Sequence, residues 1–123
     1  MPFDLIKSKN VHLKISKNRK TKLGDYRPPI YHANHRISIN HNLNKYAFLI
    51  TFLHEYAHLL VYEKYKNRVS PHGKEWKTKY RSLVEDFLDM EVFPAEIAGI
   101  LTKSIQNSKA SSSSDLKLSR MLE

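Results

Sequence analysis

Residues 44–66 constrain the fold more than any other segment, because they contain neither proline nor glycine and follow the apolar spacing of a long helix. Both sides of this predicted helix are apolar. At about 100° per residue, one side carries Leu49, Phe52, Leu53, Tyr56, Leu59 and Leu60, and the other carries Ala47, Ile50, His54, His58, Val61 and Tyr65. A helix without a solvated side must be buried between two layers. We therefore expect a central helix that other elements enclose.

Short strands precede this helix. Residues 11–16 and 35–40 alternate apolar and polar side chains, which is the pattern of half-buried strands. Residues 23–26 form a further predicted strand, which Gly24 disturbs and Pro28-Pro29 closes. We expect a small antiparallel sheet of about three strands.

Two helices are predicted after the central one. Ser70-Pro71 suits the N-cap and first turn of a second long helix over residues 72–90, and a third, shorter helix covers 95–106. Asn40 or Asn42 is expected to cap the central helix. The predicted fold class is α+β, with the sheet packed on the central helix and the second long helix.

The absence of cysteine restricts the chemistry of the chain. Disulfides, iron–sulfur clusters, thiol catalysis and cysteine-based zinc fingers are excluded, so a metal must be bound by His, Asp or Glu. No signal peptide is recognisable, and the most apolar run, residues 46–62, is interrupted by His54, Glu55 and His58. We expect a cytoplasmic protein that does not interact with a membrane.

Positive charge is concentrated in two segments. The chain has 21 Lys and Arg against 12 Asp and Glu, a net charge of +9. Residues 1–24 contribute +6 (seven Lys or Arg against Asp4), and residues 59–82 contribute +5 (seven against two). Such segments favour contact with a polyanion, and DNA is the expected partner.

The central helix contains His54-Glu55-Tyr56-Ala57-His58, an H-E-x-x-H motif. Residues four apart lie one above the other on a helix, so the two imidazoles can bind one Zn²⁺. Glu55 is turned about 100° from His54, which suits a general base that contacts a metal-activated water without binding the metal. Glu55 is also the only formally charged residue from 46 to 62, and a metal would compensate its carboxylate in an apolar layer.

A catalytic zinc site needs a third protein ligand. His72 is favoured, because it is the only histidine after His58 and follows the loop that turns the chain back. Glu75 is the alternative and would complete a site of two histidines and one carboxylate.

The motif and its surroundings resemble the SprT-like family of zinc metalloproteases, which includes a protease of DNA–protein crosslinks. The similar residues are His54-Glu55-x-x-His58, His72-Gly73-Lys74-Glu75-Trp76, and the segments 22–26 and 37–40. The resemblance covers roughly residues 11–90.

The resemblance implies a zincin-like domain over residues 1–107, with His54, His58 and His72 as zinc ligands and Glu55 as general base. It also implies that an edge strand, here residues 35–40, receives an extended substrate. Many relatives continue into a cysteine-containing module, whereas residues 108–123 of this chain form a serine-rich tail without cysteine.

Two functions follow from these features. The first is a zinc-dependent metallopeptidase that hydrolyses peptide bonds of a protein or peptide substrate through a metal-activated water, with DNA-associated proteins as candidate substrates. The alternative is a non-catalytic, basic nucleic-acid-binding domain with a structural metal site, which the charge of 1–24 and 59–82 favours.

Other candidate residues receive simpler interpretations. Trp76 and Tyr80 are expected to pack in the core beside His72. Four histidines, His12, His32, His35 and His41, are expected at the surface or at caps, since none has a partner at ligand spacing. The residues that could stabilise an oxyanion are Tyr62, Tyr65, Tyr80 and His35, which the sequence does not rank.

Overall fold

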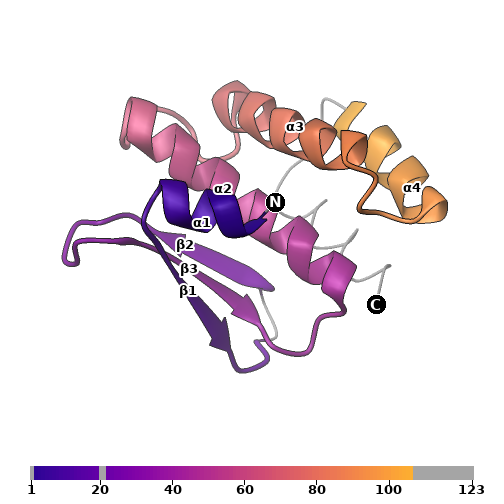
Figure 1. Ribbon diagram of the computed structural model, residues 1–123. Helices are drawn as coiled ribbons and strands as arrows, with labels where there is room; N and C mark the ends of the chain where they lie inside the picture. The colour runs from indigo at the N-terminus through magenta and orange to yellow at the C-terminus, as the bar shows by residue number, and fades with distance from the viewer. Residues whose placement is uncertain (1, 20–21, 107–123) are drawn as a thin grey trace.

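The computed structural model describes residues 2–19 and 22–106, and it confirms the predicted α+β class (Figure 1). The elements in chain order are α1 (Pro2–Ser8), β1 (Val11–Ser16), β2 (Gly24–Arg27), β3 (His35–Asn40), α2 (Lys45–Tyr65), α3 (Lys74–Asp89) and α4 (Ala95–Gln106). Within these described ranges, no helix has the length and apolarity needed to cross a bilayer. The predicted tail, residues 108–123, lies outside the described residues.

The three strands form a mixed sheet in the order β1-β3-β2. β2 is antiparallel to β3, with Gly24 opposite Ile39 and Arg27 opposite Arg36. β1 is parallel to β3, from the pair Val11 and His35 to the pair Ser16 and Asn40. The prediction of an antiparallel sheet is therefore wrong for β1. Side chains alternate in the same way in parallel and antiparallel strands, so the pattern carried no information on direction.

Asn40 holds the connection that makes β1 parallel to β3. Its side chain is fully buried, donates to the backbone oxygens of Lys22 at 2.9 Å and Arg19 at 3.4 Å, and accepts from the Arg19 Nε at 2.7 Å. These bonds hold the β1–β2 connection against the end of β3. β1 and β2 consequently lie on opposite sides of β3. Asn40 consequently does not cap α2.

Asn44 caps α2 instead of Asn40 or Asn42. Its side-chain oxygen accepts from the backbone N–H groups of Tyr46 at 3.0 Å and Ala47 at 2.9 Å. The prediction was wrong by a few residues because several asparagines precede the helix, and only the backbone path decides which one reaches the first turn.

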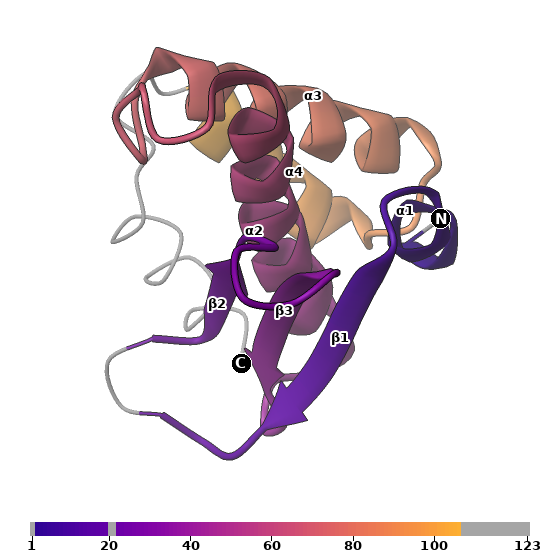
Figure 2. The ribbon, with the colours of Figure 1, turned by 90° about the vertical axis from the view of Figure 1, so that its left-hand side faces the viewer.

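α2 lies between the sheet and α3, as both views of the ribbon show (Figures 1 and 2). Its buried residues extend from Ala47 to Val61 and include positions on both sides of the helix. The predicted enclosure of the central helix is confirmed.

Two helix starts differ from prediction. α1 was not expected, although Asp4 in its first turn and Lys7 in its last turn match the helix dipole. It packs beside β1, and the Tyr56 hydroxyl of α2 donates to the backbone oxygen of Leu5 at 3.1 Å. α3 begins at Lys74 rather than at residue 72, and its N-cap is Gly73, so Ser70-Pro71 belongs to the preceding turn. His72 is therefore presented by a turn and not by a helix.

Candidate metal centre

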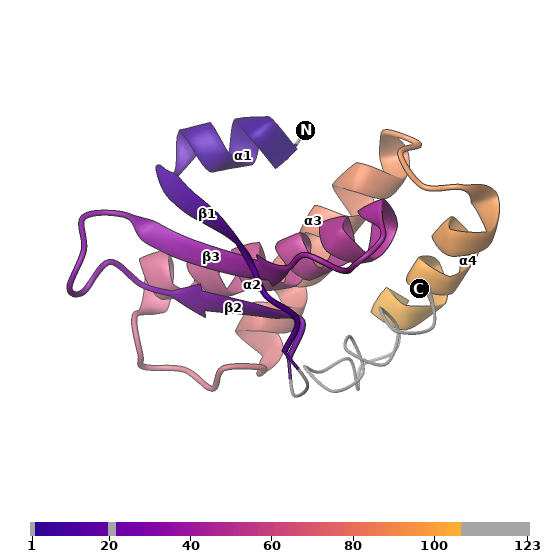
Figure 3. The ribbon, with the colours of Figure 1, turned by 90° about the horizontal axis from the view of Figure 1, so that it is seen from below.

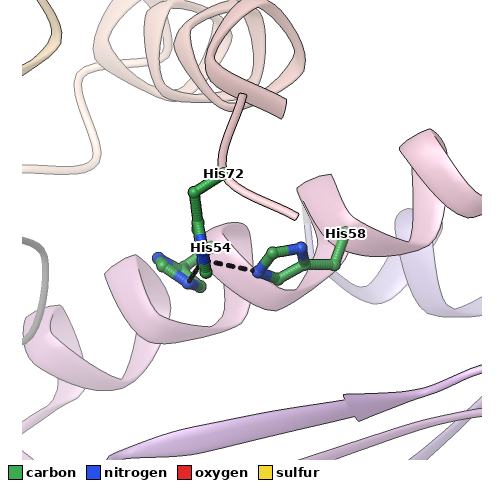
Figure 4. Close-up of side chains that lie close together, drawn as sticks. All are labelled: His54, His58 and His72. Carbon is green, nitrogen blue, oxygen red and sulfur yellow. Dashed lines mark hydrogen bonds between the residues drawn. The ribbon is translucent and has the colours of Figure 1, made fainter. Parts of the chain in front are cut away.

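Three histidines from two parts of the chain meet at one point (Figure 4). His54 and His58 are one turn apart on the same side of α2, and His72 reaches them from the turn that precedes α3. The Nε2 atom of His72 lies 3.0 Å from that of His58 and 3.4 Å from that of His54. One ligand nitrogen of each residue lies within 4.8 Å of the others. The structure thus brings together the three residues that the sequence suggested, and Glu75 is not part of the group.

The donor set fits a tetrahedral metal ion. Nitrogens bound to one zinc ion at about 2.0–2.1 Å lie roughly 3.3 Å apart, which is close to the two separations that His72 makes. Burial first, and then the charges of His54 and His72, lower the pKa of His58 to about 3, so the His58 ring is neutral at pH 7. A neutral imidazole is the form that binds a metal.

Trp76 of α3 supports all three imidazoles. Its side chain is fully buried, and its ring centroid lies 4.7 Å from that of His54, 5.5 Å from that of His58 and 4.9 Å from that of His72. Its indole N–H donates to the backbone oxygen of His54 at 3.2 Å. The ring of Tyr80 stacks on that of Trp76, with 4.9 Å between the two ring centroids. The predicted packing role of Trp76 and Tyr80 is confirmed.

Glu55 lies beside the histidine cluster and close to β2. Its side chain is buried, and its Oε2 atom is 3.9 Å from the Nε2 atom of His54. Gly24 permits this arrangement, because a Cβ atom there would lie 2.6 Å from the Thr51 Cγ2 and 3.2 Å from the Glu55 Cγ. The glycine that disturbs the strand pattern is therefore the position at which β2 lies directly against α2.

A groove of about 570 Å³ opens over the cluster. It is lined by His54, Glu55, His58 and His72, by Gly24, Asp25 and Tyr26 of β2, and by Lys22, Pro28, Val61, Tyr62, Lys66, Asn67, Val69 and Pro71. The Glu55 side chain and the three imidazoles therefore line the same groove. This arrangement can hold a metal ion beside a carboxylate that has access to a bound ligand.

Comparison with known proteins agrees with this geometry. The model of the SprT-like family matches residues 2–97, which is well over half of the chain. The chain belongs to the SprT-like family. Protein SprT of Proteus mirabilis (strain HI4320) is 42% identical to it over 59 residues, which are 45% of this chain and 34% of that protein. The match thus spans about a third of the length of this curated relative. No solved structure matched the chain.

In this SprT-like chain, the four residues that could stabilise an oxyanion lie in different surroundings. Tyr62 lines the groove, whereas Tyr65 does not. Tyr80 is buried behind the cluster, 1% exposed, with its ring 6.0 Å from that of His54. His35 is also buried and points to other partners. Among the four, Tyr62 alone borders the groove in the described structure.

His35 was expected at the surface or at a cap, and this prediction is wrong because the residue is buried. It is 8% exposed, and its Nδ1 atom lies 2.7 Å from the Tyr26 hydroxyl while its Nε2 atom lies 3.4 Å from a carboxylate oxygen of Glu63. Glu63 also pairs with Lys9 at 2.9 Å. Although burial raises the pKa of Glu63, its hydrogen bonds and ion pairs with Lys9 and His35 outweigh it and lower that pKa. The other three, His12, His32 and His41, are exposed as expected.

Tyr26 is the groove residue that sequence reasoning missed. His35 bridges Glu63 and Tyr26, because its Nε2 atom lies beside the Glu63 carboxylate and its Nδ1 atom shares a hydrogen bond with the Tyr26 hydroxyl, and this bond holds the phenol at the groove. Burial raises the pKa of Tyr26, so the phenol stays protonated. A signal existed, because Tyr26 follows Gly24 by two residues and strand periodicity places both on the side that faces α2.

The sheet edge beside the groove is β2 and not β3. The family resemblance implied that residues 35–40 form an edge strand for substrate, but β3 is the central strand and is paired on both sides. β2 has β3 on one side, and Gly24, Asp25 and Tyr26 line the groove. The expected edge was wrong because strand order depends on the connections between strands and not on their local patterns.

Proposed function

We propose that this chain is a zinc-dependent metallopeptidase that hydrolyses peptide bonds of a protein or peptide substrate. The observation that carries the proposal is the meeting of the His54, His58 and His72 Nε2 atoms beside the Glu55 carboxylate in one groove. Three imidazoles with an adjacent carboxylate are the donor set of a catalytic zinc site with an open position. Membership of the SprT-like family supports the same assignment.

Each residue has a distinct role in this proposal. His54, His58 and His72 would hold Zn²⁺, which supplies Lewis acidity for the carbonyl and lowers the pKa of water. Glu55 accepts a proton from the attacking water and then donates it to the leaving amine. Tyr62 borders the groove and is the candidate donor to the developing oxyanion.

The β2 edge is the proposed support for the substrate backbone. It is short and lies along the groove beside Glu55, so an extended peptide paired with Gly24–Arg27 would pass the catalytic carboxylate. Tyr26, held by His35, would contact the side chains of such a peptide.

The test combines metal content with one conservative substitution. Protein purified without chelator should contain one zinc per chain, and Glu55→Gln should keep the zinc while peptide hydrolysis falls by about 10²–10⁴, the usual contribution of a general base. Glu85→Gln is the matched control, because Glu85 is exposed on α3 and pairs with Arg81 at 3.5 Å, away from the groove. Undiminished hydrolysis by Glu55→Gln, or protein without stoichiometric zinc, would contradict the proposal.

The cytoplasm is the proposed location, because no signal peptide is recognisable in the sequence. We also propose DNA-associated proteins as substrates. The support is the basic charge of residues 1–24 and 59–82 and the family resemblance. The measurement is the rate of cleavage of a DNA-binding protein with and without DNA. DNA binding by Glu55→Gln, combined with no proteolysis by the unmodified chain, would favour the alternative of a non-catalytic nucleic-acid-binding domain with a structural metal.

A further inference from the structure

The face of the sheet that points away from α2 is polar and basic. Figure 3 shows the sheet from this side, with no helix of the described chain in front of it. Strand periodicity places on this face the residues that alternate with the core positions Ile37 and Ile39. They are His12, Lys14 and Ser16 of β1, Arg36 and Ser38 of β3, and Asp25 and Arg27 of β2.

A hollow of about 180 Å³ lies on this face. Four cationic side chains line it, together with one carboxylate and two serines: Lys14, Arg19, Arg27, Arg36, Asp25, Ser16 and Ser38. The carboxylate is already compensated, because Asp25 lies 3.1 Å from the Arg27 Nε and 3.4 Å from the Lys22 Nζ. The hollow therefore has a clear excess of positive charge.

The pairing of β2 with β3 is a second observation, besides the excess of positive charge, that favours an anionic ligand. Arg27 of β2 is directly opposite Arg36 of β3. Like charges directly opposite each other destabilise a sheet. Of the two arginines, Asp25 offsets the charge of Arg27 alone, so an anion beside Arg36 would reduce the remaining repulsion.

Arg19 gives the strongest indication of an anionic ligand, because its side chain is held in place while one of its nitrogen donors has no partner. Its Nε donates to the Asn40 side chain at 2.7 Å, and its Nη1 donates to the Ser38 hydroxyl at 3.1 Å. Its Nη2 is buried and has no hydrogen-bond partner among residues 2–19 and 22–106. The same holds for the buried hydroxyl of Ser16 in the described chain. A buried donor without a partner is costly, and both groups line the hollow.

We propose that this hollow binds a phosphate group. Guanidinium groups match phosphate oxygens in charge and in planar, bidentate geometry, and a serine hydroxyl supplies a further donor. β2 lines both cavities: Gly24 and Tyr26 line the metal groove, Arg27 lines the hollow, and Asp25 lines both. A phosphate-bearing molecule would thus be held against the back of the strand that borders the groove. The proposal does not depend on peptidase activity.

The experiment measures binding of two probes to the full chain. Titration calorimetry with inorganic phosphate tests the free ion, and fluorescence anisotropy with a labelled single-stranded oligonucleotide, at several salt concentrations, tests a phosphodiester. The variant is Lys14→Gln with Arg36→Gln, which removes two charges from the hollow and no side-chain hydrogen bond that the structure shows. The matched control is Lys45→Gln with Lys103→Gln, which removes two charges from exposed positions on α2 and α4, outside the basic segments 1–24 and 59–82.

We expect the hollow variant to weaken binding of the probe by about tenfold or more, since charge-assisted hydrogen bonds are lost. The control variant should change binding by no more than about twofold, with both variants folded by circular dichroism. Saturable binding of inorganic phosphate identifies a free-ion site, and binding of the oligonucleotide alone identifies a phosphodiester site. Equal weakening in both variants, unchanged binding in the hollow variant, or binding of neither probe would overturn the proposal.

Discussion

Replacing Gly24 with alanine tests the contact that places β2 against α2. The new Cβ would lie 2.6 Å from the Thr51 Cγ2 and 3.2 Å from the backbone oxygen of Ser38 and the Glu55 Cγ. The first distance is about 1 Å shorter than the optimal separation of two carbon atoms, roughly 3.5–4.0 Å. Thr51 is buried on a helix, where its branched side chain has few χ1 rotamers, so its methyl group has little room to move away.

Overpacking of this kind costs about 1–3 kcal/mol, and the lower entropy of the unfolded alanine chain offsets about 0.4–1 kcal/mol. We therefore expect Gly24→Ala to lower the free energy of unfolding by about 1–2 kcal/mol. Denaturant titration measures this change from the midpoint. Peptide hydrolysis should also fall, because the same Cβ displaces Glu55.

Two further variants make the test specific to this contact. Thr51→Ser removes the clashing methyl group, so the double variant should recover part of the loss, with a coupling energy of about 1 kcal/mol. Gly99→Ala is the control, because a Cβ at Gly99 of α4 has no neighbour within 4 Å, and it should stabilise the helix by about 0.5–1 kcal/mol. The reasoning is refuted if Gly24→Ala is as stable as the unmodified chain, or if Thr51→Ser restores nothing.

The remaining predictions concern the histidines and the wall of the groove. His72→Ala should abolish stoichiometric zinc binding by metal analysis, whereas Glu75→Ala should retain it; the reverse result would make Glu75 the third ligand. A chelator should lower the unfolding temperature of the unmodified chain and have no such effect on His72→Ala, because a ligand that binds only the folded state stabilises it. Tyr26→Phe leaves the buried Nδ1 of His35 without its 2.7 Å partner and should cost about 1–3 kcal/mol in denaturant unfolding. Tyr31→Phe, at a side chain that is 93% exposed, should change stability by less than about 0.5 kcal/mol, and equal effects of the two tyrosine variants would contradict the role given to His35.

Local periodicity was sufficient to predict much of this fold. The strands at residues 11–16 and 35–40 and the helix at 95–106 have the predicted bounds, and α2 differs from prediction by one residue at each end. These elements were predictable because alternation and helical spacing depend on neighbouring residues. The candidate site was predictable for the same reason, since His54, Glu55 and His58 lie within one turn of α2.

Features that join distant segments could not be predicted in this way. The sequence by itself determined where most of the helices and strands lie, which of their sides are apolar, and that two histidines and a carboxylate share one helix. Only the tertiary structure decided that β1 is parallel to β3, that β2 and not β3 borders the groove, and that Tyr26 is held there by a buried His35. It also gathered Lys14, Arg19, Arg27 and Arg36 from three strands and a connection into one hollow. The physical reason is that strand order and direction follow from the path of the connections, which Asn40 holds through contacts 18 and 21 residues away in sequence.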